Sequence, residues 1–171
     1  MVAIKLKGQV FTFDYIVGFV MFIIIVVIAG KQLVNILPSP SYENLYDENV
    51  YLSTTLLQPG YPSDWTPGNV LIPGIASNNR MDETKLANFD TFTYDETKSF
   101  FHIASEYLFY FKNDTGIVPL VGECNFGFAV PTNMTTCEPD ITSLGYANLV
   151  KTSRIVIYKS DVIEMVLYSW N

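Results

Sequence analysis

KLKGQVFTFDYIVGFVMFIIIVVIAGK, the stretch from Lys5 to Lys31, decides how this chain is organised. No charged or amide side chain interrupts it between Tyr15 and Ile28. The 21 residues from Val10 to Gly30 would span roughly 32 Å as a helix, at about 1.5 Å per residue, which matches the hydrocarbon thickness of a bilayer. The stretch therefore predicts a single transmembrane helix, which we expect to continue to residue 37 before Pro38 ends or kinks it.

One carboxylate, Asp14, lies near the start of this stretch. A charged side chain at the bilayer centre costs roughly 2.5–3.5 kcal/mol on insertion scales, and the cost falls toward the interface. Asp14 would lie about one turn inside the interface, so two interpretations stay open. Either the carboxylate meets a partner charge during assembly, or it caps the start of the helix and reaches toward the lipid headgroups.

The charges that flank the apolar stretch predict its orientation. Lys5 and Lys7 precede it, and positively charged flanks favour the cytoplasmic side. We therefore expect a single-pass membrane protein with its N-terminus in the cytoplasm and residues from Lys31 onward outside the cell. The alternative is a secretory signal cleaved after Val27-Ile28-Ala29, but Thr12 and Asp14 fit such a leader poorly. We favour the retained helix.

Charge also narrows the classes of partner. The chain carries a formal charge of −7, and residues 31–171 hold eight basic and sixteen acidic side chains. Such an acidic balance repels phosphate backbones, and no basic patch interleaved with aromatic residues is visible in the sequence. We expect no nucleic-acid partner.

Cysteines and asparagine sequons agree with an extracellular domain. In an oxidising compartment Cys124 and Cys137 would pair, and closing so short a loop contributes about 3 kcal/mol on the chain-entropy model. A metal site is the weaker interpretation, because His102 is the only histidine and no Cys-x-x-Cys motif is present. Asn113 and Asn133 head two possible glycosylation sequons. We expect neither a metal nor another cofactor.

The first part of the outer domain predicts short helices and an ordered loop. Ser41 could cap a helix over residues 42–57, with Leu45, Leu52 and Leu56 on its apolar side. Four prolines and three glycines follow in residues 58–74, and they predict a loop with a fixed path wrapped over a buried Trp65. A repeated Asp-Glu-Thr-Lys begins at Asp82 and at Asp95, and we interpret both aspartates as helix N-caps rather than as a cation site.

From residue 107 onward the hydrophobic pattern changes to that of strands. Residues 107–112 predict a strand covered on both faces, followed by a turn and a return strand within 117–121. Residues 127–130 are a further strand candidate, and 154–158 with 162–170 predict a hairpin. The fold class is therefore α+β, with a transmembrane helix followed by short helices and a small, mainly antiparallel β-sheet domain. We divide the chain into a basic leader (1–8), an apolar helix (9–37) and an extracytoplasmic domain (38–171).

The sequence offers little for catalysis. His102 lies in an aromatic helical pattern, where we interpret it as structural, and no Gly-x-Ser-x-Gly elbow accompanies it. No glycine-rich phosphate loop or zinc-binding His-Glu-x-x-His is present in the sequence either. We interpret Trp65 and Trp170 as core residues rather than as a sugar-stacking platform. We do not expect an enzyme.

A family resemblance rests on the start of the chain. Gly8-Gln9, with two lysines before it and an apolar helix with an early acid after it, resembles the class III (prepilin-type) signal peptide of archaeal type IV pilin-like proteins. The segments TLLQPGYPSDWTPGNVLIPGIASNNRMDETKLANF and SRIVIYKSDVIEMVLYSW also look like the body of small archaeal membrane-anchored, pilin-like proteins. In this chain Phe11 and Phe13 stand where serine and glutamate are common in such leaders, and Asp14 lies one place later than the usual acid.

This resemblance implies a function and a set of partners. A prepilin-type peptidase would cut between Gly8 and Gln9 on the cytoplasmic side and leave the apolar helix in place. Asp14 would then pair with the new α-amine of Gln9 in an adjacent subunit, and Gly18 would let helices pack closely. The chain would be a structural pilin-like subunit of a cell-surface filament, in contact with the membrane and with copies of itself or other pilin subunits. Two alternatives stay open: a permanently anchored extracytoplasmic binding module that uses the loop around Tyr61–Trp65, and a minor pilin of another filament.

Overall fold

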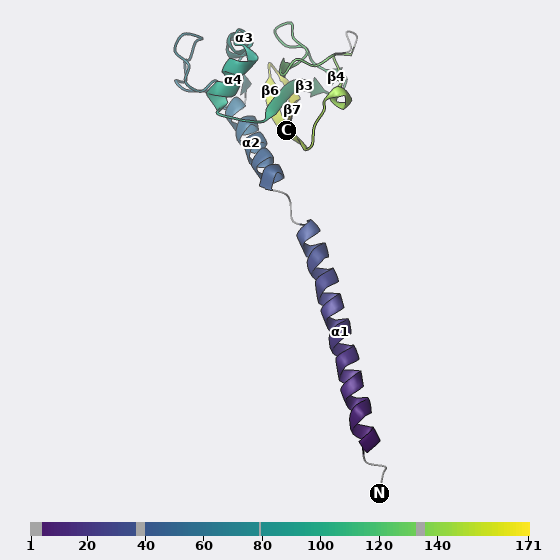
Figure 1. Cartoon of the computed structure of the whole chain (residues 1–171). Helices are drawn as coiled ribbons and strands as arrows, with labels where there is room; N and C mark the ends of the chain where they lie inside the picture. Colours follow the sequence, from purple (N-terminus) through teal and green to yellow (C-terminus); the bar gives the residue numbers. More distant parts are fainter. Residues whose placement is uncertain (1–4, 37–39, 79, 133–135) are drawn as a thin grey trace. The chain divides into compact units, whose positions relative to one another are not determined.

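The computed structural model describes residues 5–36, 40–78, 80–132 and 136–171, with side chains from Phe13 to Lys31 and from Ser41 onward within these ranges. Figure 1 shows the chain from its N-terminal helix to its C-terminal strands. The chain divides into two compact units, residues 1–40 and 41–171. Pro38, where the sequence predicts the end of the first helix, and Asn133, the second predicted sequon, lie outside the described residues.

The first unit contains one helix, α1 (Lys5–Ile36). It includes the predicted apolar segment and begins four residues before Gln9, so that the Gly8–Gln9 peptide bond lies inside the helix. Its apolar residues are mainly β-branched and aromatic, no proline interrupts it, and the backbone hydrogen bonds can be satisfied within the helix. Such a segment needs no neighbouring element in order to hold its shape in an apolar medium.

The second unit starts with helix α2 (Pro40–Leu56), which covers one face of a sheet. Leu45, Leu52 and Leu56 are buried, as their spacing predicts. The buried amide of Asn49 donates a hydrogen bond of 2.8 Å to the Ser169 hydroxyl and so attaches α2 to the last strand. The helix begins at Pro40 rather than after Ser41, consistent with the preference of proline for the first turn.

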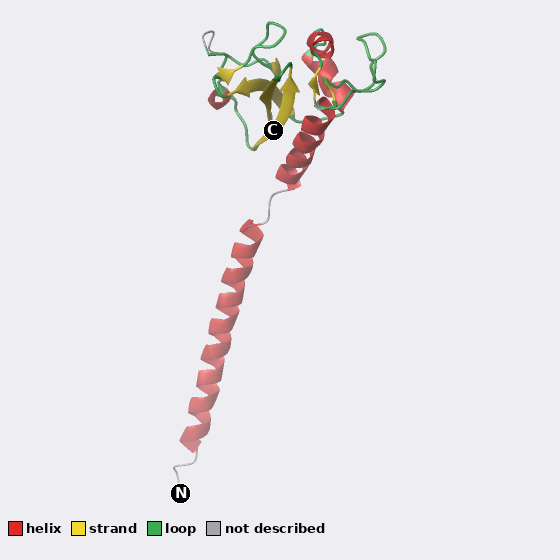
Figure 2. Ribbon diagram, turned by 180° about the vertical axis from the view of Figure 1, so that it is seen from behind, coloured by secondary structure: helices red, strands yellow, loops and turns green. Residues whose placement is uncertain are grey.

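The sheet has seven strands in the order β1-β2-β6-β7-β3-β4, and β5 also pairs with β3. Figure 2 shows the longer strands in yellow. The strands are β1 (Ala76–Ser77), β2 (Arg80–Met81), β3 (Glu106–Asn113), β4 (Gly116–Ile117), β5 (Phe126–Gly127), β6 (Leu149–Tyr158) and β7 (Asp161–Trp170). The sequence predicts a mainly antiparallel sheet of about four strands. The structure has a curled, mixed sheet, because β2 joins β6 in parallel at Arg80 and Ile157.

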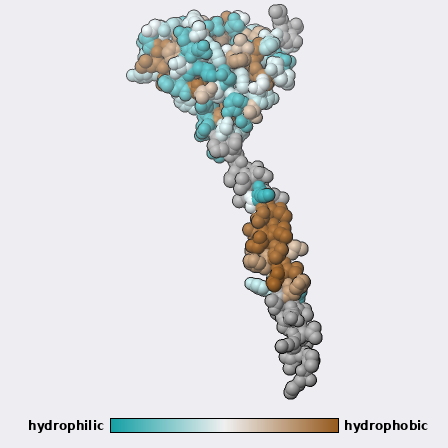
Figure 3. Space-filling view, viewed as in Figure 1, coloured by the Kyte–Doolittle hydropathy of each residue, from teal (hydrophilic) through white to brown (hydrophobic). Residues whose placement is uncertain are grey.

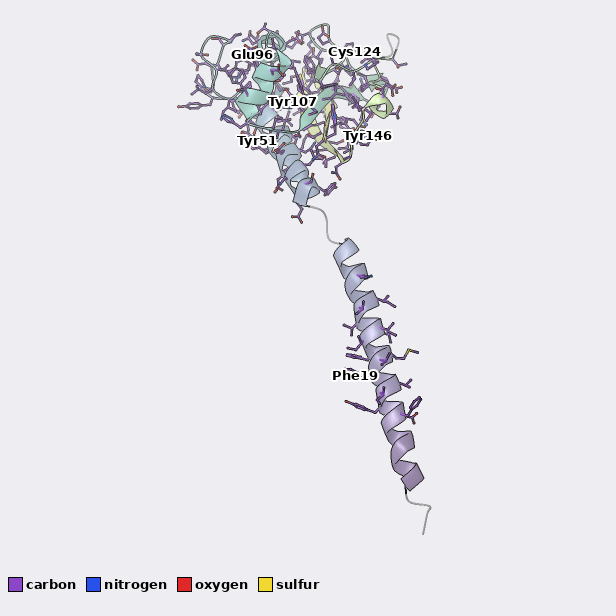
Figure 4. The ribbon with its side chains drawn as sticks, viewed as in Figure 1. Phe19, Tyr51, Glu96, Tyr107, Cys124 and Tyr146 are labelled. Carbon is purple, nitrogen blue, oxygen red and sulfur yellow. A yellow bond between two sulfur atoms is a disulfide. The ribbon has the colours of Figure 1, made fainter. Side chains whose placement is uncertain are left out.

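Strand β3 and the β6–β7 hairpin form the centre of the sheet. Seven residues of β3 pair with β7, and all ten residues of β6 pair with β7. Residues 107–111 are buried on both faces, as their apolar composition predicts. On one face Phe109 stacks on Phe126 at 5.2 Å between ring centroids and contacts Phe89 at 5.8 Å. Figure 4 places Tyr107 in the middle of this unit.

The two short helices differ in how they are capped. Helix α3 (Glu83–Asp90) begins after Asp82, whose carboxylate accepts the N–H groups of Thr84 and Lys85, as predicted. For α4 (Tyr94–Phe101) the predicted N-cap, Asp95, is wrong. The cap is Thr93, which exchanges hydrogen bonds with Glu96 in a capping box. Thr93 lies three residues before Glu96, which is the spacing of a capping box. This motif, and not the repeated Asp-Glu-Thr-Lys, therefore determines the N-cap.

The loop between α2 and β1 follows a fixed path over a buried tryptophan. Trp65 is 2% exposed, and its indole N–H donates a 2.9 Å hydrogen bond to the carbonyl of Gly74. The prediction of a core tryptophan is confirmed. Gly74 has no room for a side chain, because an added Cβ would lie 2.2 Å from the carbonyl oxygen of Gln58. The tryptophan therefore does not offer a stacking face to a ligand.

Three further strand predictions need correction. The return strand expected within 117–121 is limited to β4, and the one expected at 127–130 is limited to β5. The positive φ of Val121 and the Leu120–Glu123 bridge turn the chain back before a longer ladder can form. The C-terminal hairpin starts earlier than predicted, at Leu149, because β7 supplies a paired partner for each residue of the longer strand.

Candidate membrane anchor and assembly site

Apart from Asp14 and Lys31, the surface of residues 13–31 of α1 is apolar around the helix. Residues 13–31 form the only described segment that is long and apolar enough to cross a membrane, and none of it is buried within the chain. Figure 3 shows this segment as a brown band, and Figure 4 shows Phe19 pointing outward from the helix. A helix that is apolar all round must be covered by lipid or protein. By length and composition, α1 can serve as a membrane anchor or as a signal sequence.

Two predicted assembly residues lie on this surface. Asp14 is exposed, and no hydrogen bond or ion pair joins its carboxylate to another described residue. At Gly18 an added Cβ would meet no atom within 4 Å, so the position is open to a neighbouring helix. Asp14 and Gly18 are four residues apart and therefore lie on the same side of α1. Close approach at the glycine would bring a second helix near the carboxylate.

The predicted processing residues, Gly8 and Gln9, are placed by their backbone alone. Both belong to the first turns of α1. Within the uncut chain the peptide bond between them is therefore helical.

The disulfide and the first sequon lie in the second unit. Cys124 and Cys137 are within bonding distance, as predicted, with Cα atoms 5.2 Å apart. Asn113 is exposed at the end of β3, where its side-chain oxygen accepts hydrogen bonds from the N–H and the hydroxyl of Thr115 in the turn that follows. The side-chain amide is therefore accessible, as glycosylation requires.

His102 ends α4 rather than lying inside it. It adopts a left-handed conformation with φ 53° and is exposed, and Nδ1 lies 3.2 Å from the carbonyl oxygen of Phe100. No serine or carboxylate contacts the ring among the described residues. In the same part of the chain no three His, Cys, Asp or Glu side chains gather closely enough to hold a metal ion.

A network of polar groups joins α4 to β3. Tyr94 donates a 2.5 Å hydrogen bond to Glu106, and Lys98 forms an ion pair with the same carboxylate at 2.8 Å. Burial and the hydrogen bond to Glu106 raise the pKa of Tyr94. Burial acts to raise the pKa of Glu106, but the hydrogen bonds from Lys98 and Tyr94 outweigh it and hold that pKa below its usual range. The network stabilises the packed junction between α4 and β3. Its polar groups bond to one another and are not directed at a ligand site.

Sequence reasoning missed one group of residues, the basic side chains of β2 and β6. Three ion pairs are present in the described part of the chain: Lys98–Glu106, Lys112–Glu164 and Lys159–Glu83. Arg80, Lys151 and Arg154 belong to none of them. Arg80 lies beside β6 only because β2 pairs with that strand in parallel at Ile157, which nothing in the local sequence indicates.

Comparison with known proteins adds no relative: no family model, curated protein or solved structure matches the chain.

Proposed function

We propose that the chain is a structural, membrane-anchored subunit of a pilin-like surface filament, with α1 as both anchor and assembly element. The observation that carries the proposal is the surface of residues 13–28, which is apolar except for Asp14, a carboxylate with no ion pair or hydrogen bond to any other described residue. Lipid would cover the apolar side chains but would offer the carboxylate no counter-charge. A neighbouring subunit would supply both.

The second unit supports this proposal by having its own core. Its aromatic cluster and its sheet are complete without α1. The unit can therefore fold outside the membrane while the helix stays in the bilayer. Its paired cysteines suit an oxidising exterior, and two lysines before the apolar segment suit a cytoplasmic N-terminus.

The processing step of the proposal comes from the resemblance of Gly8-Gln9 to a prepilin-type leader. Cleavage there would create an α-amine at Gln9, five residues before Asp14. In a water-poor bundle of helices this amine on one subunit would pair with Asp14 on the next, and a buried carboxylate requires such a partner. This pairing would fix the axial position of one subunit relative to the next.

The test is filament formation by an Asp14→Ala variant in the native host. We expect the variant to reach the membrane in normal amount but to be missing from sheared surface filaments, because the charge that sets the contact is lost. Tyr15→Leu, which changes the neighbouring residue and keeps it apolar, should assemble as the unmodified chain does. Normal filaments from the Asp14→Ala chain would contradict the assembly role of this carboxylate. Wild-type chain that stays in the membrane without any filament would contradict the proposed function itself.

A further inference from the structure

One face of the sheet in the second unit is covered over only part of its length. Val166 and Ile155 lie on this same face, because Val166 pairs with Ser153, two residues from Ile155. Val166 is buried, whereas Ile155 is 71% exposed. Val162, which is 66% exposed, pairs with Ile157 and is therefore a diagonal neighbour of Ile155. Two adjacent aliphatic side chains thus lie open on a sheet that is otherwise packed.

These two side chains belong to a hollow of about 660 Å³, which we call the aliphatic hollow. Polar side chains surround Ile155 and Val162 there, and they come from the end of β3 and from the β6–β7 hairpin. The other residues that line the hollow are Lys112, Asn113, Asp114, Ser153, Ile163 and Glu164. An occupant of this hollow needs both an apolar surface and hydrogen-bonding groups.

The charges around the aliphatic hollow are balanced. Lys112 and Glu164 form an ion pair at 3.0 Å, and the Glu164 carboxylate also accepts a hydrogen bond from Ser153. The charge of Lys151 acts on Glu164 as well, so that two lysines stand against Glu164 and Asp114. A charged partner therefore finds no opposite field to bind. A neutral molecule with hydroxyl groups can bond to these side chains and leave their charges paired.

The aliphatic hollow contains an attachment point for such a molecule. Asn113, which lines the hollow and is exposed, is the first residue of an Asn-x-Thr sequon with Asp114 and Thr115. Its side-chain oxygen accepts hydrogen bonds from the Thr115 N–H at 2.9 Å, the Thr115 hydroxyl at 2.7 Å and the Gly116 N–H at 3.2 Å. These bonds hold the asparagine by its oxygen and leave the amide nitrogen for a covalent bond.

We propose that Asn113 carries an N-linked glycan and that this glycan fills the aliphatic hollow, over Ile155 and Val162. In the attachment step the side-chain nitrogen of Asn113 forms a bond to the anomeric carbon of a lipid-linked sugar phosphate. The bond from that carbon to the phosphate oxygen breaks, the phosphate leaves with the electron pair, and the nitrogen gives one proton to a base of the transferase. The proposal rests on the extracellular placement of the second unit in the proposed function and goes beyond that function.

The tether selects the glycan over other neutral occupants. A glycan attached at Asn113 is held at the hollow by its own covalent bond, so its local concentration is high without any affinity from solution. The C–H faces of its sugar rings would cover Ile155 and Val162, which removes apolar surface from water. Its hydroxyl groups would bond to Ser153 and Asp114. The glycan thereby replaces the protein cover that the other part of this face has.

The first test is the mass of the peptide that contains Asn113, from protein made in the native host. Wild type should carry the added mass of a glycan on this peptide. Thr115→Ala should lose the added mass completely, because the sequon is removed, whereas Thr115→Ser keeps the sequon and should keep the glycan. Both variants retain the bond from the backbone N–H of residue 115 to Asn113, so equal urea midpoints should show that both are folded.

The second test is hydroxyl-radical labelling of native membranes, which reports the exposure of single side chains. Ile155 and Val162 should be labelled weakly in wild type and in Thr115→Ser. In Thr115→Ala their labelling should rise toward that of Leu71, an aliphatic residue outside the hollow that is 61% exposed. The labelling of Leu71 itself should not change between the variants.

Three outcomes would overturn the proposal. A disulfide-bonded chain without a glycan on Asn113 would refute the modification and leave the proposed function intact. A glycan on Asn113 with equal labelling of Ile155 in wild type and Thr115→Ala would refute the cover, and equally weak labelling would show that a protein partner lies there instead. A chain with neither glycan nor disulfide would contradict the extracellular placement on which both proposals rest. If filaments are missing while the glycan and the protection are present, the proposed function fails and this inference stands.

Discussion

At the scale of single residues, the clearest stabilising feature is a buried lysine. Lys85 is 7% exposed, and its ammonium donates to the carbonyl oxygens of Pro59 at 2.6 Å and Ser63 at 2.7 Å. A buried ammonium requires such acceptors. Lys85 thus holds the loop of residues 58–74 against α3. Its sequence context does not distinguish it as buried, because Lys98, the lysine of the second Asp-Glu-Thr-Lys, is half-buried and forms an ion pair with Glu106 instead.

Replacing Lys85 by methionine should loosen this loop. The carbonyls of Pro59 and Ser63 would lose a charged donor, and a hydrogen bond to a charged group contributes about 1.5–3 kcal/mol net to stability. We expect the free energy of unfolding to fall by about 2 kcal/mol and proteolysis to begin within residues 58–74. Urea denaturation and limited proteolysis measure the two effects. Arg80→Met, an exposed change nearby, should alter stability by less than about 0.5 kcal/mol, and an equal loss in both variants would contradict this role of Lys85.

Glu106 predicts how stability depends on pH. Its folded-state pKa lies below the ordinary value because the hydrogen bonds from Lys98 and Tyr94 favour the carboxylate over the opposing effect of burial. A lowered folded-state pKa gives stability that is present above the ordinary pKa and is lost as the pH falls through the folded one. Glu106→Gln should therefore be less stable than wild type at pH 7, and the difference should shrink at about pH 3, below the ordinary glutamate pKa. Urea midpoints at the two pH values measure this, and a difference that does not change with pH would contradict it.

At the scale of elements, long helices and strands with a regular hydrophobic period could be predicted from the sequence, and two-residue strands could not. The apolar run of α1, the two-sided burial of β3 and the β6–β7 hairpin each follow from a long, consistent period. Strands β1 and β2 are two residues each, too short to carry a period, and tertiary pairing alone forms them. The position of Arg80 beside Ile157 of β6 escaped prediction for this reason. Asp14 and Gly18 were open to prediction because they interrupt a uniform apolar segment.

The capping of α4 gives a direct test of an element. Thr93→Ala removes the hydroxyl half of the capping box and leaves the backbone N–H bond to Glu96, and we expect a loss of about 1 kcal/mol in the free energy of unfolding. Asp95→Ala changes an exposed first-turn carboxylate that makes no cap and should cost only a few tenths of a kcal/mol. Urea denaturation of both variants decides between the two residues. A larger loss of stability in Asp95→Ala than in Thr93→Ala would show that the aspartate of the repeated motif is the N-cap.

At the scale of the whole molecule, the chain separates two tasks. Residues 1–40 form a unit whose apolar surface has no cover within the chain, and residues 41–171 form a unit with a complete core. Asp14 is the only acidic residue of the first unit, and the other sixteen belong to the second. A filament subunit needs both parts at once: a helix that moves from lipid to protein surroundings, and a folded exterior.

The most direct measurement of this account is the intact, unreduced mass and the N-terminal residue of the protein recovered from its native membrane. The account predicts a chain that begins at Gln9 and carries one disulfide, because prepilin-type processing would keep the apolar helix and free the amine that pairs with Asp14. A chain that begins at Gly30 would have lost the helix, and one that begins at Met1 would never have been processed. Either result would contradict the assignment as a processed pilin-like subunit.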